Sequence, residues 1–334
     1  MKKTCGSDGL THRTSWAQHA GIMTGSRQIQ RPGVGMALIS ISMLMIPALD
    51  AFAKLLGAEC GWLEITFWRF FMQTVLTLPF IIAFGTWEIP KGTLLLQMIR
   101  GLLLAAATAF FFAALKTLPM AEAISIFFMQ PMILTLLSAL LLGEQLRIRR
   151  LGAILAGFIG TLIILQPSVL AFGWAAALPM ASALMMALYM IVTRHLSAQV
   201  GAIQMQFLGS TTSMFVLAGL LALGSWAGVS DASVTALSLT QISWIIGMGI
   251  IATSAHLLMV LSTKYAPANL LAPFQYLEII GASTLGFIVF GDVPANTTFA
   301  GVSIIIISGL YLFHRERISG RQRNAANGQE SINA

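Results

Sequence analysis

Charged residues are scarce in this chain of 334 residues. Asp, Glu, Lys and Arg make up only 9% of it and hydrophobic residues 57%, whereas about 25% of an average soluble domain is charged. A water-soluble protein of this size needs charged surface that this sequence does not have. Hydrophobic runs recur from residue 34 to residue 313, and runs of about 20 residues predict membrane-spanning helices. We therefore expect an all-α integral membrane protein.

The sequence also lacks the motifs of the common enzyme classes. Cys5 and Cys60 are isolated, with neither metal-ligand nor redox spacing, so no disulfide framework is expected. The Gly-x-Gly patterns at 33–35 and 247–249 lack the strand–turn–helix context of a nucleotide site. No metal cluster or hydrolytic triad is recognisable. We expect no cofactor, no enzymatic activity and no nucleic-acid partner.

Ten membrane spans can be drawn through the hydrophobic part of the chain. Short connections with turn-forming residues separate them, and each span must be helical because unpaired backbone groups in lipid cost several kcal/mol each. The flanking segments 1–33 and 315–334 are polar and basic. Because the first has no apolar core before a cleavage site, we interpret it as a disordered cytoplasmic tail and not as a signal peptide. The predicted spans are 34–56, 62–84, 94–115, 120–142, 148–166, 172–193, 205–224, 242–263, 269–291 and 297–314.

The distribution of Lys and Arg predicts the orientation. With the N-terminus inside, sixteen of the 19 basic residues fall on the cytoplasmic side, two (Lys54 and Lys116) fall outside, and Arg69 lies within the second span. Such an excess marks the cytoplasmic side of a membrane protein. We therefore expect both termini to be cytoplasmic, and a net positive charge that reflects topology.

A repeat appears when the sequence is shifted by 148 positions. The shift places Lys116-x-x-Pro119 on Lys264-x-x-Pro267, Gly143-Glu144 on Gly291-Asp292, and Gly101 on Gly249. We therefore predict two five-span repeats, 34–166 and 172–314. Because five is odd, the second repeat must be inverted in the membrane relative to the first. Inverted repeats are typical of secondary transporters, whose substrate site lies near the midplane between the halves.

Several stretches resemble the EamA-type transporters of the drug/metabolite transporter superfamily. They are PALDAFAKLL (47–56), EITFWRFF (64–71), the segment 100–146 with its Ala-Leu-Lys-x-x-Pro-x-Ala-Glu-Ala turn, and LAPFQYLEIIGASTLGFIVFGD (271–292). The resemblance covers nearly all of 34–314. It implies a ten-helix carrier of small metabolites in the bacterial inner membrane that does not hydrolyse ATP.

Family members often carry Glu-Pro in the middle of spans four and nine, and this chain departs from that pattern. The first copy reads Gln130-Pro131 and the second reads Glu278-Ile279. Within the superfamily, LDAFAK and FQYLE are most similar to bacterial riboflavin transporters, and also to S-adenosylmethionine carriers and amino-acid exporters. The resemblance alone therefore implies riboflavin uptake as the first hypothesis.

Glu278 and Arg69 are the principal candidates for a site. A charge near the midplane costs about 2.5–3.5 kcal/mol on insertion scales, so Glu278 should face the interior of the protein. It is either a substrate or coupling site, or a carboxylate that locks helices together. Arg69 can pair with Glu278, bind an anionic or carbonyl group of the substrate, or extend toward the cytoplasmic interface.

The other candidates lie in spans one, eight and nine. Asp50 and Lys54 are four residues apart, share a helix face, and are expected to pair with each other. His256 lies opposite Thr108 in the repeat alignment and is either an interhelical hydrogen-bond partner or a proton relay. On a regular helix Phe274, Gln275 and Glu278 form one stripe, with Tyr276 beside it, that suits a planar polar heterocycle.

We therefore expect a secondary transporter that works by alternating access, with riboflavin uptake as the best hypothesis. An exporter of amino acids or related metabolites and an S-adenosylmethionine carrier remain open. A lipid-modifying membrane enzyme would need a cluster of acids or histidines, whereas this chain scatters its polar residues singly. The expected partners are a small-molecule substrate and the bilayer. The predicted site residues are Glu278, Arg69, Gln275, Phe274, Tyr276, Asp50, Lys54, His256 and Gln130.

Overall fold

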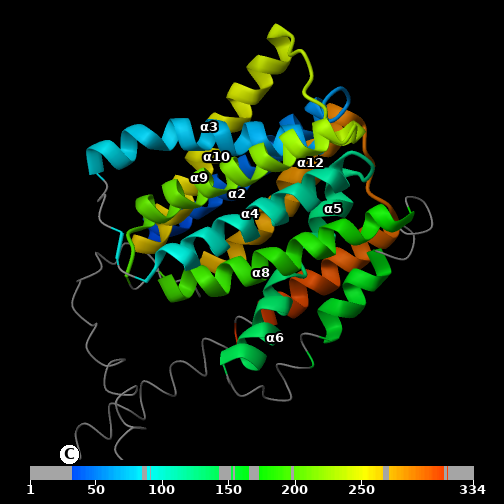
Figure 1. Cartoon of the computed structure of the whole chain (residues 1–334). Coiled ribbons are helices and arrows are strands. Elements are labelled where there is room, and N and C mark those ends of the chain that lie inside the picture. The colour runs from blue at the N-terminus through cyan, green and yellow to red at the C-terminus, as the bar shows by residue number, and fades with distance from the viewer. Residues whose placement is uncertain are drawn as a thin grey trace, which may run out of the picture.

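Helices make up all the regular structure in the part of the chain that the computed structural model describes. The described residues are 32–84, 89–90, 92–142, 152, 155–164, 173–196, 199–265, 271–311 and 314. The predicted tails 1–33 and 315–334 fall almost wholly outside them. The labelled helices of Figure 1 are α2 (Pro32–Leu56), α3 (Trp62–Phe84), α4 (Leu94–Leu115), α5 (Met120–Phe127), α6 (Gln130–Leu142), α8 (Leu178–Leu196), α9 (Ala202–Trp226), α10 (Leu239–Tyr265) and α12 (Leu277–Phe290).

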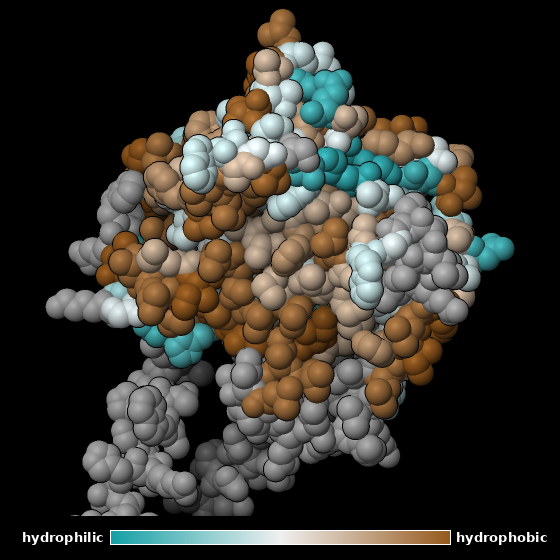
Figure 2. All heavy atoms as spheres, turned by 45° about the vertical axis from the view of Figure 1, so that its right-hand side comes forward, coloured by the Kyte–Doolittle hydropathy of each residue, from teal (hydrophilic) through white to brown (hydrophobic). Residues whose placement is uncertain are grey.

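The helices have the length and composition of a membrane protein. Among the described residues, seven helices are long and apolar enough to cross a bilayer, and three shorter apolar helices are Leu155–Ile164, Phe274–Phe290 and Asn296–Tyr311. Large apolar side chains such as Ile82, Phe84 and Ile288 are exposed. In Figure 2 hydrophobic residues cover most of the visible face, and hydrophilic ones gather in a band toward its upper end. Such a surface is suited to contact with lipid.

The helices pack in reciprocal pairs. α2 packs on α10 and α12, and α8 packs in the same way on α4 and α6. α3 lies beside α9 (Figure 1), α10 packs on α3, and α4 packs on α9. Each of these contacts between the sequence repeats therefore has a counterpart in which the two repeats have exchanged roles.

Two glycines at the repeat spacing explain the close approach of these helices. A Cβ atom at Gly101 in α4 would collide with the Thr212 side chain and the Gly209 carbonyl oxygen of α9. A Cβ atom at Gly249 in α10 would collide with the Met72 side chain of α3. Small residues allow membrane helices to pack closely, and here the equivalent glycine of each repeat contacts the second helix of the other repeat.

Two predicted spans are not continuous α-helices. The predicted span 120–142 divides into α5 and α6, with a turn at 128–129 just before Pro131. The predicted span 269–291 begins with a short 3₁₀ helix, Ala272–Tyr276, before α12. Proline lacks the N–H group that a continuous helix requires, and Pro131 and Pro273 stand at these two points. α5 packs against α12, so the interruptions lie close together in the fold.

Candidate functional site

The interrupted helices border a cavity between the two repeats. Its volume is about 160 Å³, and both repeats contribute to its walls. The first repeat contributes side chains from α2 to α6, and the second contributes them from α8, α10, the 3₁₀ helix and α12. The lining includes Asp50, Arg69, Thr108, Phe111, Phe127, Phe128, Gln130, Ser182, Tyr189, His256, Met259, Gln275 and Glu278.

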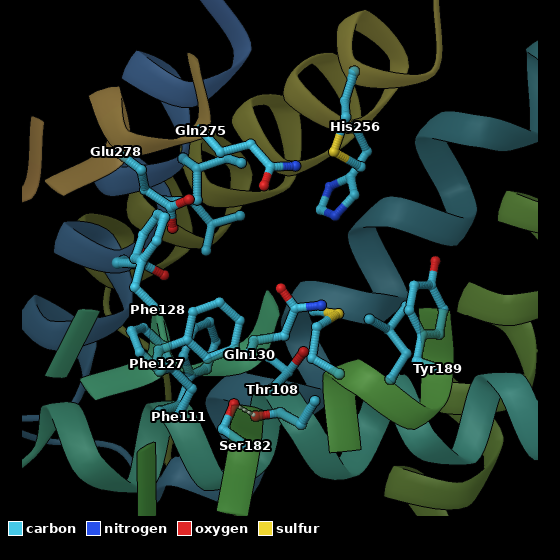
Figure 3. Close-up of a pocket in the computed structure, with 18 of the residues that line it drawn as sticks. Thr108, Phe111, Phe127, Phe128, Gln130, Ser182, Tyr189, His256, Gln275 and Glu278 are labelled. Carbon is cyan, nitrogen blue, oxygen red and sulfur yellow. Dashed lines mark hydrogen bonds between the residues drawn. The ribbon is translucent and has the colours of Figure 1, made fainter. Parts of the chain in front are cut away.

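Residues at the repeat spacing of 148 face each other in pairs within this cavity. Four such pairs contribute both members to its lining: Thr108 with His256, Phe111 with Met259, Phe127 with Gln275, and Gln130 with Glu278. In Figure 3, His256, Gln275 and Glu278 lie on one side of the space, and their counterparts Thr108, Phe127 and Gln130 lie on the other. The lining positions of the two repeats are therefore equivalent, but the side chains at these positions differ in chemistry.

A fifth equivalent pair closes the aromatic end of the cavity. Phe128 and Tyr276 are 148 residues apart, and their ring centroids lie 5.4 Å apart with the planes tilted by 30°. Phe111 and Phe127 meet edge to face nearby, with centroids 5.5 Å apart. The rings of Phe111, Phe127 and Phe128 are grouped at one end of the space in Figure 3. This arrangement offers aromatic faces and edges to a planar ligand.

Asp50 and Glu278 place two carboxylates at the cavity. Asp50 is buried, with 4% of its surface exposed, and Glu278 is half-buried in the first turn of α12. Within the described ranges, neither forms a hydrogen bond or an ion pair. Asp50 is near enough to interact electrostatically with both Glu278 and Arg69. Unpaired carboxylates inside a membrane protein are costly, which makes Asp50 and Glu278 candidates for a functional role.

Arg69 lies at the cavity and does not extend to the interface. It is 5% exposed, and its Nη1 donates a hydrogen bond of 3.0 Å to Thr108 Oγ1. Its guanidinium carbon lies 4.5 Å from the centroid of the Phe70 ring, and its buried Nε has no hydrogen-bond partner among the described residues. The possible ion pair with Glu278 is not formed, since no nitrogen of Arg69 lies within 4 Å of a Glu278 oxygen. Arg69 therefore retains donor capacity for a ligand.

His256 and Tyr189 lie at the opposite end of the cavity from the phenylalanine rings (Figure 3). His256 Nδ1 is 2.8 Å from the Ala252 carbonyl oxygen of its own helix, so the hydrogen bond is intrahelical and not interhelical. Arg100 fixes Tyr189, because its Nη2 donates to the Tyr189 hydroxyl at 2.5 Å. Arg100 also bonds to Thr193 and to the Met205 carbonyl oxygen.

The sequence did not predict Arg100 as a residue near the site, because Arg100 was counted only among the basic residues of the cytoplasmic side. Arg100 is buried, 5% exposed, and joins α4 to α8 and α9. Sequence reasoning also misses Tyr189, Ser182 and the three phenylalanines. The repeat spacing could have identified two of these residues, since Phe111 and Phe127 are the counterparts of cavity residues in the second repeat.

The predicted pairing of Asp50 with Lys54 is wrong. Lys54 Nζ lies 2.5 Å from Asp292 Oδ2 and 4.5 Å from the centroid of the Phe290 ring. One helical turn separates Lys54 from Asp50, and the long Lys54 side chain reaches toward the end of α2, where Asp292 follows α12. Lys54 consequently lies outside the cavity, whereas Asp50 is left facing it.

The predicted stripe of Phe274, Gln275 and Glu278 is also corrected. In the 3₁₀ segment the repeat is three residues per turn, so residues at i and i+3 are aligned and residues at i and i+4 are not. Gln275 and Glu278 therefore both reach the cavity, whereas Phe274 packs in an apolar cluster with Ile39 and Met43. Tyr276 stacks on Phe128 beside the cavity, and its buried hydroxyl has no partner among the described residues.

The site offers no candidate metal centre. No group of three or more His, Cys, Asp or Glu residues in the described part of the chain could hold an ion. Chemically, the cavity provides aromatic rings, two amides, two carboxylates, one arginine and one histidine. This set can bind a ligand through stacking and hydrogen bonds.

Comparison with known proteins finds several transporters that are similar to this chain. Relatives include an S-adenosylmethionine uptake transporter of Rickettsia bellii (strain RML369-C), 23% identical over 85% of this chain and 94% of that protein. They also include a riboflavin transporter of Brucella anthropi, 28% identical over 78% and 90% of the two chains. A third is a pseudopaline exporter of Pseudomonas aeruginosa, 24% identical over 83% and 95%.

A solved crystal structure and a family model complete the comparison. The crystal structure matches with a TM-score of 0.57 at 20% identity and covers 81% of this chain and 94% of its own, which supports the fold alone. The model of the EamA-like transporter family matches residues 33–166 and again residues 173–314. The chain therefore belongs to the EamA-like transporter family.

Proposed function

We propose that this protein is a secondary transporter that carries a planar polar metabolite through the cavity between its repeats, and that the substrate is riboflavin, moving inward. The observation that carries the proposal is the pairing of equivalent residues around one cavity, above all Gln130 opposite Glu278. A site on a pseudo-symmetry axis can be presented to either side of a membrane by the same motion. Alternating access is the mechanism that this geometry favours.

The proposal includes ten helices in two inverted repeats, in the bacterial inner membrane with both termini cytoplasmic. Reciprocal packing supports the symmetry, because α2 on α10 and α12 is matched by α8 on α4 and α6. The contact between Phe128 and Tyr276 supports it further, since equivalent residues touch each other where a two-fold axis passes. The excess of basic residues on one side of the predicted spans supports the orientation.

The chemistry of the cavity favours a heterocycle. Phe111, Phe127 and Phe128 can stack on a planar ring system, and an aromatic pair contributes about 0.5–1.5 kcal/mol beyond burial. Gln130 and Gln275 can each donate and accept, so they match the carbonyl and N–H edges of such a ring. Riboflavin transporters among the relatives make a flavin the substrate that we favour.

Glu278, Asp50 and Arg69 would provide substrate binding and coupling. Glu278 can accept a hydrogen bond from the substrate or take up a proton, and Arg69 can donate to a carbonyl or hydroxyl oxygen through guanidinium N–H groups that do not bond to Thr108. In each turnover the cavity would open to one side of the membrane to bind the substrate and to the other side to release it. The empty cavity would then open again to the first side. No covalent step is required.

The two carboxylates favour S-adenosylmethionine as a second candidate. Asp50 and Glu278 face the cavity without a salt bridge, and only Arg69 among the described lining residues carries a permanent positive charge. This excess of acid suits a cationic substrate such as a sulfonium, whereas riboflavin is neutral. S-adenosylmethionine uptake transporters are also among the relatives.

Growth rescue can distinguish these candidates. The chain is expressed in a bacterium that cannot synthesise flavin and lacks its own importer, at limiting riboflavin, with membrane expression confirmed by immunoblot. We expect growth, and uptake of labelled riboflavin that excess unlabelled riboflavin suppresses. Absence of both, together with uptake of labelled S-adenosylmethionine, would replace riboflavin by the second candidate. Absence of uptake of either compound would reject both substrates.

A further inference from the structure

Four polar links join the two repeats at one end of the molecule, outside the cavity. The first repeat contributes Lys54, Glu59, Glu64 and Lys116, which lie near the end of α2, the start of α3 and the end of α4. Their partners belong to the second repeat: Asp292 after α12, Gln241 at the start of α10, and Thr235 and Asp231 between α9 and α10. All eight residues meet at the same helix ends. We call this set the end seal.

Two of the links are ion pairs that water can reach. Lys54 and Asp292 lie 2.5 Å apart, with 17% and 21% of their side chains exposed. Lys116 and Asp231 lie 2.7 Å apart and are more exposed, at 30% and 41%. An ion pair that regains water when it separates has a small net cost of opening. Such a pair is suited to form and break repeatedly.

The other two links are hydrogen bonds to carboxylates. Glu64 is fully buried, and Thr235 donates to it from its backbone N–H at 3.2 Å and from its hydroxyl at 2.9 Å. Gln241 Nε2 donates to Glu59. Gly61 lies between these links, where a Cβ atom would overlap the backbone of Asp231. The repeats are therefore in backbone contact at this end, and no side chain larger than hydrogen fits.

We propose that the end seal is the gate at this end of the cavity, and that Lys54 and Asp292 act in the transport cycle although neither touches the substrate. The inference depends on the proposed transport by alternating access. The cavity cannot open at this end while all four links hold the repeats together. Lys54 and Asp292 connect α2 with α12, the helices that carry the cavity carboxylates Asp50 and Glu278. Opening the seal would therefore move the binding groups themselves.

The test follows the accessibility of the cavity, so it does not depend on the substrate. Thr108→Cys is introduced into a Cys5→Ala/Cys60→Ala background and labelled with a membrane-impermeant thiol reagent, in right-side-out and inside-out vesicles. Lys54→Glu, which opposes Asp292, should raise the labelling rate at least several-fold in one vesicle orientation only. The charge exchange Lys54→Glu/Asp292→Lys should return labelling toward the parent value. Unchanged labelling in Lys54→Glu, or equal increases in both orientations, would overturn the proposal.

A reversible cross-link tests whether the seal must open. Lys54→Cys/Asp292→Cys in the same background is treated with a short bis-methanethiosulfonate and then with reductant. Transport should fall at least tenfold on cross-linking and recover on reduction. Each single-cysteine variant treated with the same reagent controls for loss of charge and should keep its own untreated rate. Full transport by the cross-linked protein would overturn the gate. Failure of riboflavin uptake by the parent, with side-specific labelling retained, would instead reject only the substrate.

Discussion

Glu278→Gln separates a functional carboxylate from a structural one. The substitution preserves the shape of the side chain and removes only its charge. A hydrogen bond to an ionised group contributes about 1.5–3 kcal/mol, and a bond between neutral groups about 0.5–1.5 kcal/mol. If Glu278 binds the substrate, we therefore expect a loss of about 1–1.5 kcal/mol, which is about a five- to twelvefold rise in KM.

The stability of the protein should not fall in Glu278→Gln, although its affinity for the substrate does. Glu278 lacks a salt-bridge partner in the described part of the chain, and a charge near the midplane costs about 2.5–3.5 kcal/mol on insertion scales. The neutral amide of the Glu278→Gln variant would avoid that cost, so the thermal midpoint in detergent should be equal or higher. A carboxylate that locked helices together would instead give a lower midpoint when neutralised.

The assay uses purified protein in proteoliposomes. Concentrative uptake and counterflow exchange are measured in parallel. If Glu278 also couples transport to protons, the Glu278→Gln variant should lose concentrative uptake and retain counterflow. The matched control is Gln130→Glu/Glu278→Gln, which moves the carboxylate to the equivalent position across the cavity and should restore part of the lost affinity. Wild-type KM and concentrative uptake in Glu278→Gln, with a lowered thermal midpoint, would refute the reasoning.

Three further substitutions test other parts of the account. Arg69→Lys keeps the positive charge but removes the planar guanidinium, including the Nη1 that bonds to Thr108 and the unpaired Nε. The KM for uptake should therefore rise about tenfold while the thermal midpoint changes little. An unchanged KM would contradict this prediction. Gly249→Leu forces α10 away from α3 and should destabilise the protein by about 1–3 kcal/mol, measured by thermal unfolding, whereas an unchanged midpoint would show that the contact is loose. Tyr276→Phe removes a buried hydroxyl without a partner among the described residues and should keep transport and raise the midpoint; a large loss of uptake would give that hydroxyl a role.

The sequence alone located the helices well, because the bilayer dictates their length and polarity. Among the described residues, seven predicted spans match helices long and apolar enough to cross a membrane, and the other three overlap shorter apolar helices. The spacing of 148 residues also led to residues that line one cavity, since Gln130 and Glu278 are both in its walls. Periodicity and hydropathy respond to the solvent around a helix, and here the solvent is lipid.

Local backbone geometry and long side chains were harder to predict. The 3₁₀ segment Ala272–Tyr276 changes the register, so Phe274 leaves the cavity and Gln275 enters it. Lys54 pairs with Asp292, which is 238 positions away in the chain, and not with its helical neighbour Asp50. Helix-face rules apply to neighbours on one regular helix and do not include contacts between helices. Tertiary packing alone determines those contacts.

The most direct test of the central claim is uptake of labelled riboflavin by two tryptophan variants in proteoliposomes. Thr108→Trp fills the cavity, whereas Thr284→Trp adds the same bulk on the exposed face of α12. With equal amounts of folded protein, we predict near wild-type uptake by Thr284→Trp and no measurable uptake by Thr108→Trp. Equal uptake by the two variants would contradict the assignment of the substrate path to the cavity between the repeats.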